Sequence, residues 1–332
     1  MNSSRKEIPR LRFAHLPTPI EELGRLSKAL GGPRIFVKRG DATGLALGGN
    51  KTRKLEFLIA DAIHKSADTI VTAGAAQSNH CRQTAATAAK FGLGCVLVLN
   101  GPRPEASSAN ILLDSLLGAR IVWVERREDR ERVQQEVCAE LAAAGQVPYF
   151  MPYGGSTPVG ALGYAFAVEE AMKQGMDADW HVFGTSSGGT HAGLALGARI
   201  FGLRGKVLGI SIDESEAWLK ERVSSLASDA SELIGPRIEV RPEDILANDA
   251  YCGAGYGVLT DAEIEAVGLF ARTEGLLLDP VYTGRAAAGL IDLARKGLFG
   301  KDETVLFWNT GGQPALFAEK YQGRLAAEVR AR

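Results

Sequence analysis

The feature that most constrains the fold is the alternation of short apolar segments with longer helical ones. Residues 34–39, 69–74 and 95–100 are short apolar segments typical of strands, whereas 51–65 and 78–91 have the spacing or alanine content of helices. Short apolar strands separated by helices indicate parallel sheets covered on both faces, so the sequence predicts an α/β fold. Further strands are expected at 119–124, 147–151, 181–184, 206–212 and 304–309, and further helices near 107–117, 127–143, 157–173, 189–201, 261–274 and 284–296.

Length and turn residues indicate more than one domain. The chain has 332 residues, more than one hydrophobic core usually holds, so about two domains or one large α/β unit is expected. The Gly-rich segment 153–163 is the best boundary candidate on its turn residues. Parallel sheets bind ligands beyond the carboxyl ends of their strands, so functional residues are expected at the strand–helix turns.

Composition excludes several classes of protein. The net charge is −1, so no basic field indicates nucleic acid or an anionic membrane as a partner. The four cysteines form no Cys-x-x-Cys pair, which argues against a disulfide framework or a structural zinc site. The N-terminal residues lack an apolar signal core, and no apolar stretch is long enough to cross a bilayer. We therefore expect a cytoplasmic protein without a metal site.

The segment GLALGGNKTRKLEF (44–57) places Lys51 just inside the start of a helix, with Asn50 as the expected cap. The positive end of a helix disfavours a neighbouring ammonium group, which lowers the pKa of a lysine there. A neutral amine is what Schiff-base chemistry requires. The competing interpretation is a capped helix with solvated lysines. A nucleotide-binding P-loop is excluded, because that motif needs glycine directly before the lysine.

A second motif, HVFGTSSGGTHAG (181–193), reads as a strand, a loop of small residues and a helix. Backbone N–H groups at a helix N-terminus bind anions, and the hydroxyls of Ser186, Ser187 and Thr190 add donors, so the loop indicates a phosphate site. The same residues match the nucleophile elbow of α/β-hydrolases. In that fold the base is a histidine far downstream of the nucleophile. Here the last histidine is His191, only five positions after Ser186, so a serine hydrolase of that order would have no base. A plain capped turn remains the other interpretation.

Four motifs in order resemble a known family: GGNKTRKLEF, AAQSNHCRQTAA (75–86), GTSSGGTHAG and LLLDPVYTGRAAAGL (276–290). Together they resemble the fold type II pyridoxal-phosphate enzymes of the D-cysteine desulfhydrase and 1-aminocyclopropane-1-carboxylate (ACC) deaminase family. The resemblance implies two open α/β domains with mostly parallel twisted sheets, and a homodimer. Residues 1–50 and 161–332 would form the larger, cofactor-binding domain and 51–160 the smaller one, with the active site in the cleft between them.

The resemblance also implies roles for individual residues. Lys51 matches the Schiff-base lysine, Asn79 the asparagine at the pyridoxal 3-hydroxyl, and Thr310 the hydroxyl at the pyridine nitrogen. Ser186, Ser187, Gly188, Gly189 and Thr190 match the phosphate-binding loop. Gln77, Ser78, Asn79, Tyr256, Tyr282 and Thr283 match positions that face the substrate, and Lys51, Ser78 and Tyr282 match catalytic ones. Lys51, or Tyr282 on the opposite face, would remove the Cα proton.

Two positions separate the two chemistries of the family. ACC deaminases carry Tyr-Glu where this chain has Tyr282-Thr283, and leucine where it has Thr310. A threonine hydroxyl stabilises a protonated pyridine less than a carboxylate does, which suits loss of a good leaving group from Cβ better than opening of a cyclopropane ring. The resemblance therefore favours conversion of D-cysteine to pyruvate, ammonia and hydrogen sulfide.

Several alternatives remain at this point. An L-cysteate sulfo-lyase, which releases sulfite, shares these motifs, and ACC deaminase is a further candidate. Arg285 could hold an anionic leaving group, but a solvated arginine at a helix start is the favoured interpretation. Outside the enzymes, a two-lobed small-ligand binding protein would have the same α/β pattern, although it would not need a lysine beside a phosphate-binding loop.

Overall fold

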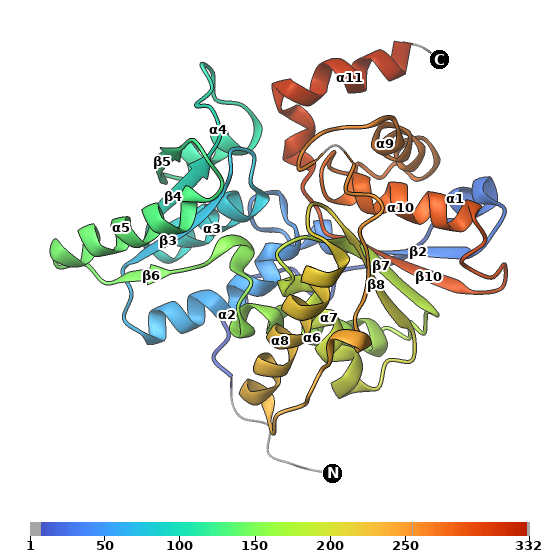
Figure 1. The fold of residues 1–332 in the computed structure, drawn as a ribbon, viewed down its shortest axis with the longest axis horizontal. Coiled ribbons are helices and arrows are strands. Elements are labelled where there is room, and N and C mark those ends of the chain that lie inside the picture. The colour runs from blue at the N-terminus through green and yellow to red at the C-terminus, as the bar shows by residue number, and fades with distance from the viewer. Residues whose placement is uncertain (1–7, 254, 331–332) are drawn as a thin grey trace.

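The computed structural model describes residues 8–253 and 255–330 of the chain. The larger of two sheets in this part has the order β1-β2-β10-β7-β8-β9 (Figure 1). Strand β1 runs antiparallel to β2 and the other neighbours pair in parallel. The strands are β1 (Ile20–Glu22), β2 (Arg34–Arg39), β7 (Trp180–Thr185), β8 (Lys206–Ser211), β9 (Leu246–Asn248) and β10 (Thr304–Asn309).

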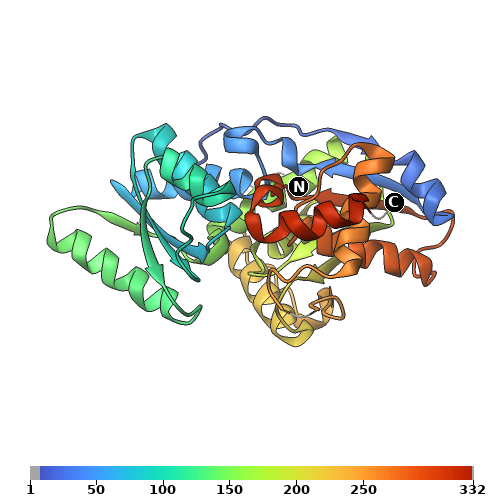
Figure 2. The same cartoon turned by 90° about the horizontal axis from the view of Figure 1, so that it is seen from above.

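The smaller sheet has the order β5-β4-β3-β6 and is parallel throughout. It lies beside the larger sheet with its own helices α3, α4 and α5 around it, as the view from above shows (Figure 2). Strand β3 is buried along nearly its whole length, as expected for the interior of a covered parallel sheet. The strands are β3 (Thr69–Ala75), β4 (Gly94–Asn100), β5 (Arg120–Val124) and β6 (Pro148–Phe150).

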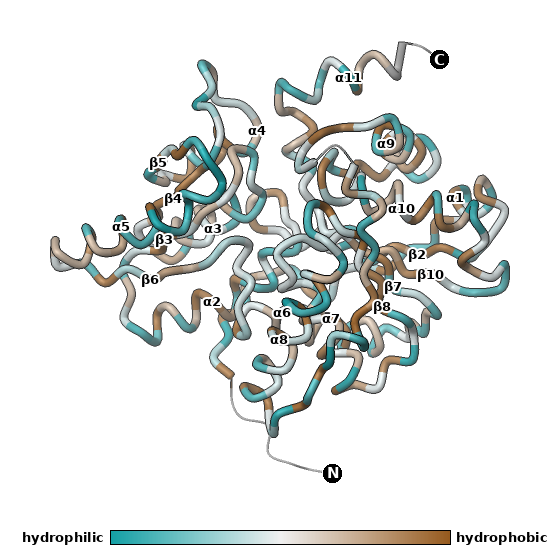
Figure 3. Tube along the Cα trace, in the orientation of Figure 1, coloured by the Kyte–Doolittle hydropathy of each residue, from teal (hydrophilic) through white to brown (hydrophobic). Residues whose placement is uncertain are grey.

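Helices cover both faces of the larger sheet. Val305 and Phe307 of β10 pack in one core with α9 and α10, whereas Leu306 and Trp308 pack on the opposite face with α6 and α7. This alternation explains why these strands are almost wholly apolar, and the strands stand out by hydropathy in Figure 3. The α-helices are α1 (Gly24–Leu30), α2 (Asn50–His64), α3 (Asn79–Phe91), α4 (Ala109–Leu116), α5 (Asp129–Ala143), α6 (Pro158–Lys173), α7 (Gly189–Phe201), α8 (Glu216–Ile234), α9 (Asp261–Glu274), α10 (Thr283–Arg295) and α11 (Glu319–Arg330).

The predicted strands and helices are all present within a few residues of their expected bounds, and the mostly parallel α/β fold is confirmed. Five of the α-helices and strands in the described part of the chain were not predicted: α1, α8, α11 and the short strands β1 and β9. Helix α8 is the longest of these, and it buries one face against α6 and α7. Serine and charged residues interrupt its apolar stripe, which weakens the helical signal in the sequence.

A buried ionic cluster ties the larger sheet to the helices beneath it. Glu170 of α6 accepts hydrogen bonds from Arg53 of α2 at 2.8 and 2.9 Å and forms an ion pair of 2.6 Å with Lys38 of β2. Arg53 and Lys38 are almost fully buried, and the Glu170 side chain is 13 % exposed. Because the two cations share one carboxylate, removing that carboxylate would leave both charges without compensation.

A helix that crosses a bilayer must be long and apolar along its whole length. Within the described residues, no helix of this chain meets both conditions.

Candidate active site

The carboxyl ends of strands from both sheets meet at one cavity. Strand β7 leads into the Gly-Ser loop, β10 into Thr310, and β3 into Ser78 and Asn79 at the start of α3. The cavity lies where the two sheets adjoin, as the α/β pattern predicted for a ligand site. Its lining consists of Asn50, Lys51, Ser78, Asn79, His80, Tyr153, Gly154, Gly184, Thr185, Ser186, Ser187, Gly188, Thr190, Tyr282, Thr310 and Gly311.

Lys51 is the second residue of α2 and points toward the turn that follows β6. Its Nζ donates a hydrogen bond of 3.4 Å to the carbonyl of Gly154. Burial lowers the pKa of Lys51 to about 8. The expected cap is wrong: Gly49 precedes the helix, and Asn50 instead donates from Nδ2 to Thr190 Oγ1 at 3.1 Å. Asn50 therefore links the lysine helix to the Gly-Ser loop.

Lys54 lies buried beside the cavity, and the sequence motifs gave it no role. It is 1 % exposed, and its Nζ donates to the same Gly154 carbonyl at 3.3 Å. A Cβ on Gly189 would lie 2.8 Å from Lys54 Nζ, so this amine reaches the beginning of α7. Burial and the nearby Lys51 lower the pKa of Lys54. The signal was present in the sequence, because residues three apart lie on the same face of a helix.

The Gly-Ser loop has the features of an anion site. Gly188 has a φ of 83°, and α7 begins at the next residue. Within the described residues, Thr185 Oγ1 and Ser186 Oγ are buried without a hydrogen-bond partner. Buried hydroxyls are nearly always paired, so these two fit a bound polar group. A helix N-terminus, unpaired hydroxyls and the Lys54 amine together suit a phosphate.

Asn79 and Ser78 begin helix α3 on the opposite side of the cavity. Ser78 caps the helix, accepting at Oγ from the Cys81 N–H at 3.1 Å, and its own hydroxyl hydrogen stays available. Asn79 Oδ1 accepts from Arg82 at 2.9 Å and from Asn110 at 3.0 Å. Because these bonds occupy the amide oxygen, Asn79 offers its Nδ2 hydrogens as donors.

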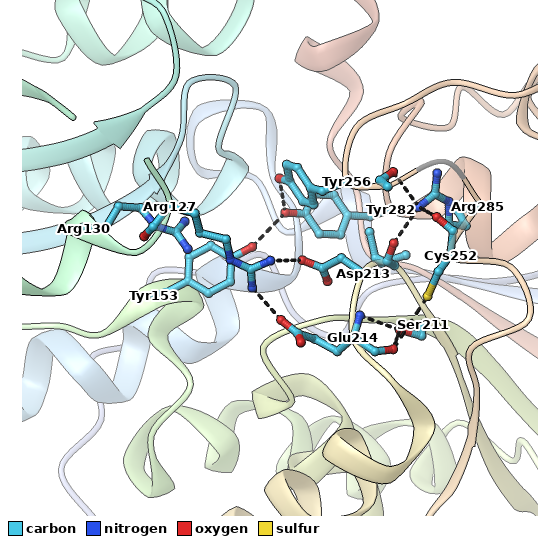
Figure 4. Close-up of polar contacts among 12 residues, drawn as sticks. Arg127, Arg130, Tyr153, Ser211, Asp213, Glu214, Cys252, Tyr256, Tyr282 and Arg285 are labelled. Carbon is cyan, nitrogen blue, oxygen red and sulfur yellow. Dashed lines mark hydrogen bonds and ion pairs between the residues drawn. The ribbon is translucent and has the colours of Figure 1, made fainter. Parts of the chain in front are cut away.

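Three half-buried tyrosines lie beside one another at one end of the cavity (Figure 4). Tyr282 Oη is 2.6 Å from Tyr256 Oη and 3.5 Å from Tyr153 Oη. Tyr282 is positioned by Asp279, whose carboxylate accepts from its backbone N–H at 2.9 Å. Burial raises the pKa of Tyr282 and of Tyr256 well above the usual value for tyrosine. Tyr282 is therefore a neutral phenol at physiological pH, suited to donating a hydrogen bond.

Some of the predicted site residues are not brought to the cavity lining. Gln77 turns toward α4, where it accepts from the Asn110 N–H at 2.9 Å. The Thr283 hydroxyl donates to Asp279 Oδ1 at 2.7 Å and accepts from the Asp279 N–H. Tyr256 lies behind Tyr282 and lines a second cavity. Sequence position alone did not distinguish residues that face the cavity from those one layer behind it.

Arg285 is not the solvated helix-start arginine that we expected, and it is not placed for a leaving group either. It is 1 % exposed and forms a 2.7 Å ion pair with Glu263. Its guanidinium also donates to the carbonyl of Cys252 at 2.8 Å (Figure 4). It donates to the carbonyl of Val258 at 2.9 Å as well. Arg285 therefore holds in place the segment that carries Tyr256.

Comparison with known proteins decides the family. The model of the pyridoxal-phosphate-dependent enzymes matches residues 11–311. The chain belongs to this family. It is similar to the D-cysteine desulfhydrase of Salmonella typhimurium, with 43 % identity over 94 % of this chain and 96 % of that protein. The D-cysteine desulfhydrase of Salmonella choleraesuis is 44 % identical over the same shares. A crystal structure of an ACC deaminase homologue has a TM-score of 0.89 and 38 % identity, covering 97 % of this chain and 96 % of that one.

Membership in the family makes the chain an enzyme whose cofactor is pyridoxal phosphate. The alternative of a two-lobed binding protein is therefore wrong. The cavity fits this cofactor: a lysine with a lowered pKa lines it, and its described residues Thr185 and Ser186, at the turn from β7 to α7, have buried unpaired hydroxyls. The Lys54 amine reaches the beginning of α7.

The position of Lys54 leads to a prediction about the phosphate. We expect Lys54→Met to raise the dissociation constant for pyridoxal phosphate by about tenfold or more, because a charge-assisted hydrogen bond contributes about 1.5–3 kcal/mol. Fluorescence titration of the cofactor-free protein measures this constant. The affinity for pyridoxal, which lacks the phosphate, should change less than about twofold.

Lys65→Met is the matched control, because the Lys65 side chain is 61 % exposed near the far end of the same helix. This variant should bind both compounds normally. Equal losses of affinity for pyridoxal and for pyridoxal phosphate in Lys54→Met would show that Lys54 does not act on the phosphate.

Proposed function

We propose that this enzyme converts D-cysteine and water to pyruvate, ammonia and hydrogen sulfide. The observation that carries this proposal is the 43–44 % identity to D-cysteine desulfhydrases over 94 % of the chain. The lining of the cavity agrees with it: among the described residues that form this lining, none is Asp or Glu. A site without a carboxylate suits the loss of a good leaving group from Cβ better than the opening of a cyclopropane ring.

Lys51 is the group we assign as the base. Bound pyridoxal phosphate supplies an electron-withdrawing ring that makes the Cα proton of an attached amino acid acidic. With a pKa of about 8, Lys51 Nζ is partly neutral near neutral pH and takes this proton. Tyr282 does not share that role, because its raised pKa keeps it protonated. This departs from the sequence analysis, which left both residues open as the base.

The remaining roles follow from the chemistry of each side chain. Lys54 and the loop from Ser186 to Thr190, with Gly188 and Gly189, would hold the phosphate at the beginning of α7. A side chain on Gly189 would collide with the Lys54 amine. Asn79 would donate to the 3-hydroxyl oxygen from Nδ2, and Thr310 would meet the pyridine nitrogen. Ser78 would hold the substrate carboxylate with its free hydroxyl hydrogen, and Gln77 would contribute only by orienting that turn through Asn110.

We also propose the organisation of the whole enzyme. Residues 51–160 form the smaller domain, a division supported by the smaller sheet, whose strands all lie between residues 69 and 150. Residues 1–50 and 161–332 form the larger domain. The described cysteines are free, which supports a cytoplasmic location, and the family resemblance supports a homodimer with small amino acids as its substrates.

A comparison of substrates tests the proposal. The purified holoenzyme is assayed with D-cysteine, L-cysteine, L-cysteate and ACC, with pyruvate or α-ketobutyrate and the sulfur product measured separately. D-Cysteine should react fastest and give equal amounts of pyruvate and sulfide. Sulfite released from L-cysteate at a higher rate would make the chain a sulfo-lyase. α-Ketobutyrate from ACC at a rate matching the best substrate would make it a deaminase.

A further inference from the structure

Tyr153 is a cavity residue that neither the motifs nor the comparisons assign to any role. It follows β6 and begins the single turn Tyr153–Gly155. The carbonyl of the next residue, Gly154, accepts hydrogen bonds from both Lys51 and Lys54. The Tyr153 hydroxyl is 3.5 Å from that of Tyr282, which comes from the larger sheet's side of the cavity (Figure 4). The two phenols therefore face each other from opposite sides of the cavity.

The ring of Tyr153 packs against Arg130 of α5, and Arg127 supports Arg130. The Arg130 guanidinium lies over the ring, with Cζ 4.6 Å from the ring centroid. Arg130 is 8 % exposed, and its Nε donates to the carbonyl of Arg127 at 3.1 Å. Arg127 pairs in turn with Asp213 at 3.0 Å and Glu214 at 2.5 Å, both on the loop after β8 (Figure 4).

The two arginines beside Tyr153 differ in how far carboxylates neutralise their charges. Two carboxylates neutralise Arg127, whereas Arg130 has no carboxylate partner in the described part of the chain. A cation held at a ring face in a partly desolvated place favours negative charge nearby. Arg127 is thus a positioning residue, and Arg130 gives the Tyr153 side of the cavity a positive field.

The spacing of the two hydroxyls suits one shared acceptor. Each phenol has one O–H donor, and O–H hydrogen bonds span about 2.7–2.8 Å. Two donors 3.5 Å apart can therefore both reach a single atom that lies between and in front of them. When Tyr256 donates to Tyr282, the Tyr282 hydrogen is free for the cavity. Such a pair, with Arg130 behind it, resembles the donor pairs that stabilise developing anions in other enzymes.

We propose that Tyr153 and Tyr282 bind the departing β-substituent, and that Tyr153 determines which leaving groups the enzyme accepts. This inference rests on the proposed elimination. In that step the Cα proton moves to Lys51 Nζ, and the C–H electron pair forms the Cα–Cβ double bond. The Cβ–S bond breaks with its electron pair going to sulfur. The two phenols donate hydrogen bonds to the hydrosulfide anion and keep their protons.

The test is the dependence of a Tyr153→Phe variant on the leaving group. A hydrogen bond stabilises a basic leaving group more than a weakly basic one. We expect kcat/KM to fall by about twofold or less for β-chloro-D-alanine, about tenfold for D-cysteine and about 100-fold for D-serine. Arg130→Met should give the same order with smaller losses, since it leaves the hydroxyl in place. Tyr149→Phe is the matched control, because Tyr149 donates to Asp61 outside the cavity.

Two failures are distinguishable. Losses of equal size for all three substrates in Tyr153→Phe would overturn the leaving-group role and would assign the residue to structure or to carboxylate binding. If the unaltered enzyme releases pyruvate from none of these substrates, the proposed elimination itself fails. Retention of the bound-cofactor absorbance by Tyr153→Phe shows that the variant is folded and loaded, so the kinetic comparison is decisive.

Discussion

Replacing Lys51 with alanine is expected to abolish pyruvate release from D-cysteine, with a loss of at least about 10³-fold in kcat. The loss is large because one amine serves two purposes: it joins the cofactor covalently, and it accepts the Cα proton. We do not expect Lys54 to take over, because its Nζ reaches the beginning of α7, where it would hold the phosphate. Steady-state assays of pyruvate release measure the effect on turnover.

Absorbance and chemical trapping report the covalent bond separately. Lys51→Ala should lose the near-visible absorbance of the lysine-bound cofactor, and borohydride should no longer fix pyridoxal to the chain. In the unaltered enzyme, a peptide containing residue 51 should carry the fixed label. Lys65→Ala, at an exposed position just after the same helix, should behave normally in both measurements. Turnover of D-cysteine at the normal rate by Lys51→Ala would refute the assignment of this lysine.

The residues that sequence could place are those with a strong local signal. The apolar segment before residue 184 and the glycines and serines of residues 184–190 predict a strand, a tight turn and a helix, and the structure has each of them. The position of Lys51 at a helix start could be predicted, because glycines and an asparagine precede it and residues with helical spacing follow it. The sheets were predictable because strands buried on both faces must be apolar along their length.

Residues placed by tertiary contacts were not predictable. Tyr153 sits in a turn without a motif, and it enters the cavity only because β6 joins β3 in the smaller sheet. Arg285 was misassigned as solvated, because the carbonyls that bury it come from a segment about 30 residues away. The prediction for the start of α2 was wrong for the same reason. Asn50 is a residue type that often caps helices, but its amide donates a hydrogen bond to Thr190 across the cavity. In each case the deciding partner is distant in sequence.

Replacing Glu170 with glutamine is expected to lower the free energy of unfolding by about 3 kcal/mol at pH 7. Burial alone would raise the pKa of Glu170, but hydrogen bonds from Arg53 and Lys38 overcome it and hold the pKa at about 2. Glutamine keeps the shape and loses the charge. Lys38 can then release its proton, whereas Arg53 stays charged and uncompensated in a buried place.

The loss of stability in Glu170→Gln should become smaller as the pH is lowered. A carboxyl group whose pKa is lower in the folded protein stabilises it above the unfolded pKa of about 4.3, and this contribution is lost as the pH falls toward 2. Urea midpoints of the unaltered enzyme and Glu170→Gln should therefore differ most at pH 6–7 and converge as the pH is lowered below about 4.

The matched control is Glu140→Gln, which removes a carboxylate from an exposed ion pair. Glu140 lies 3.3 Å from Arg120, and the side chains are 64 % and 47 % exposed. Solvent screens such a pair, so the loss should stay below about 1 kcal/mol and vary little with pH. If Glu170→Gln unfolds at the same urea concentration as Glu140→Gln at pH 7, the buried cluster does not hold α2 and α6 to the sheet in the way its geometry indicates.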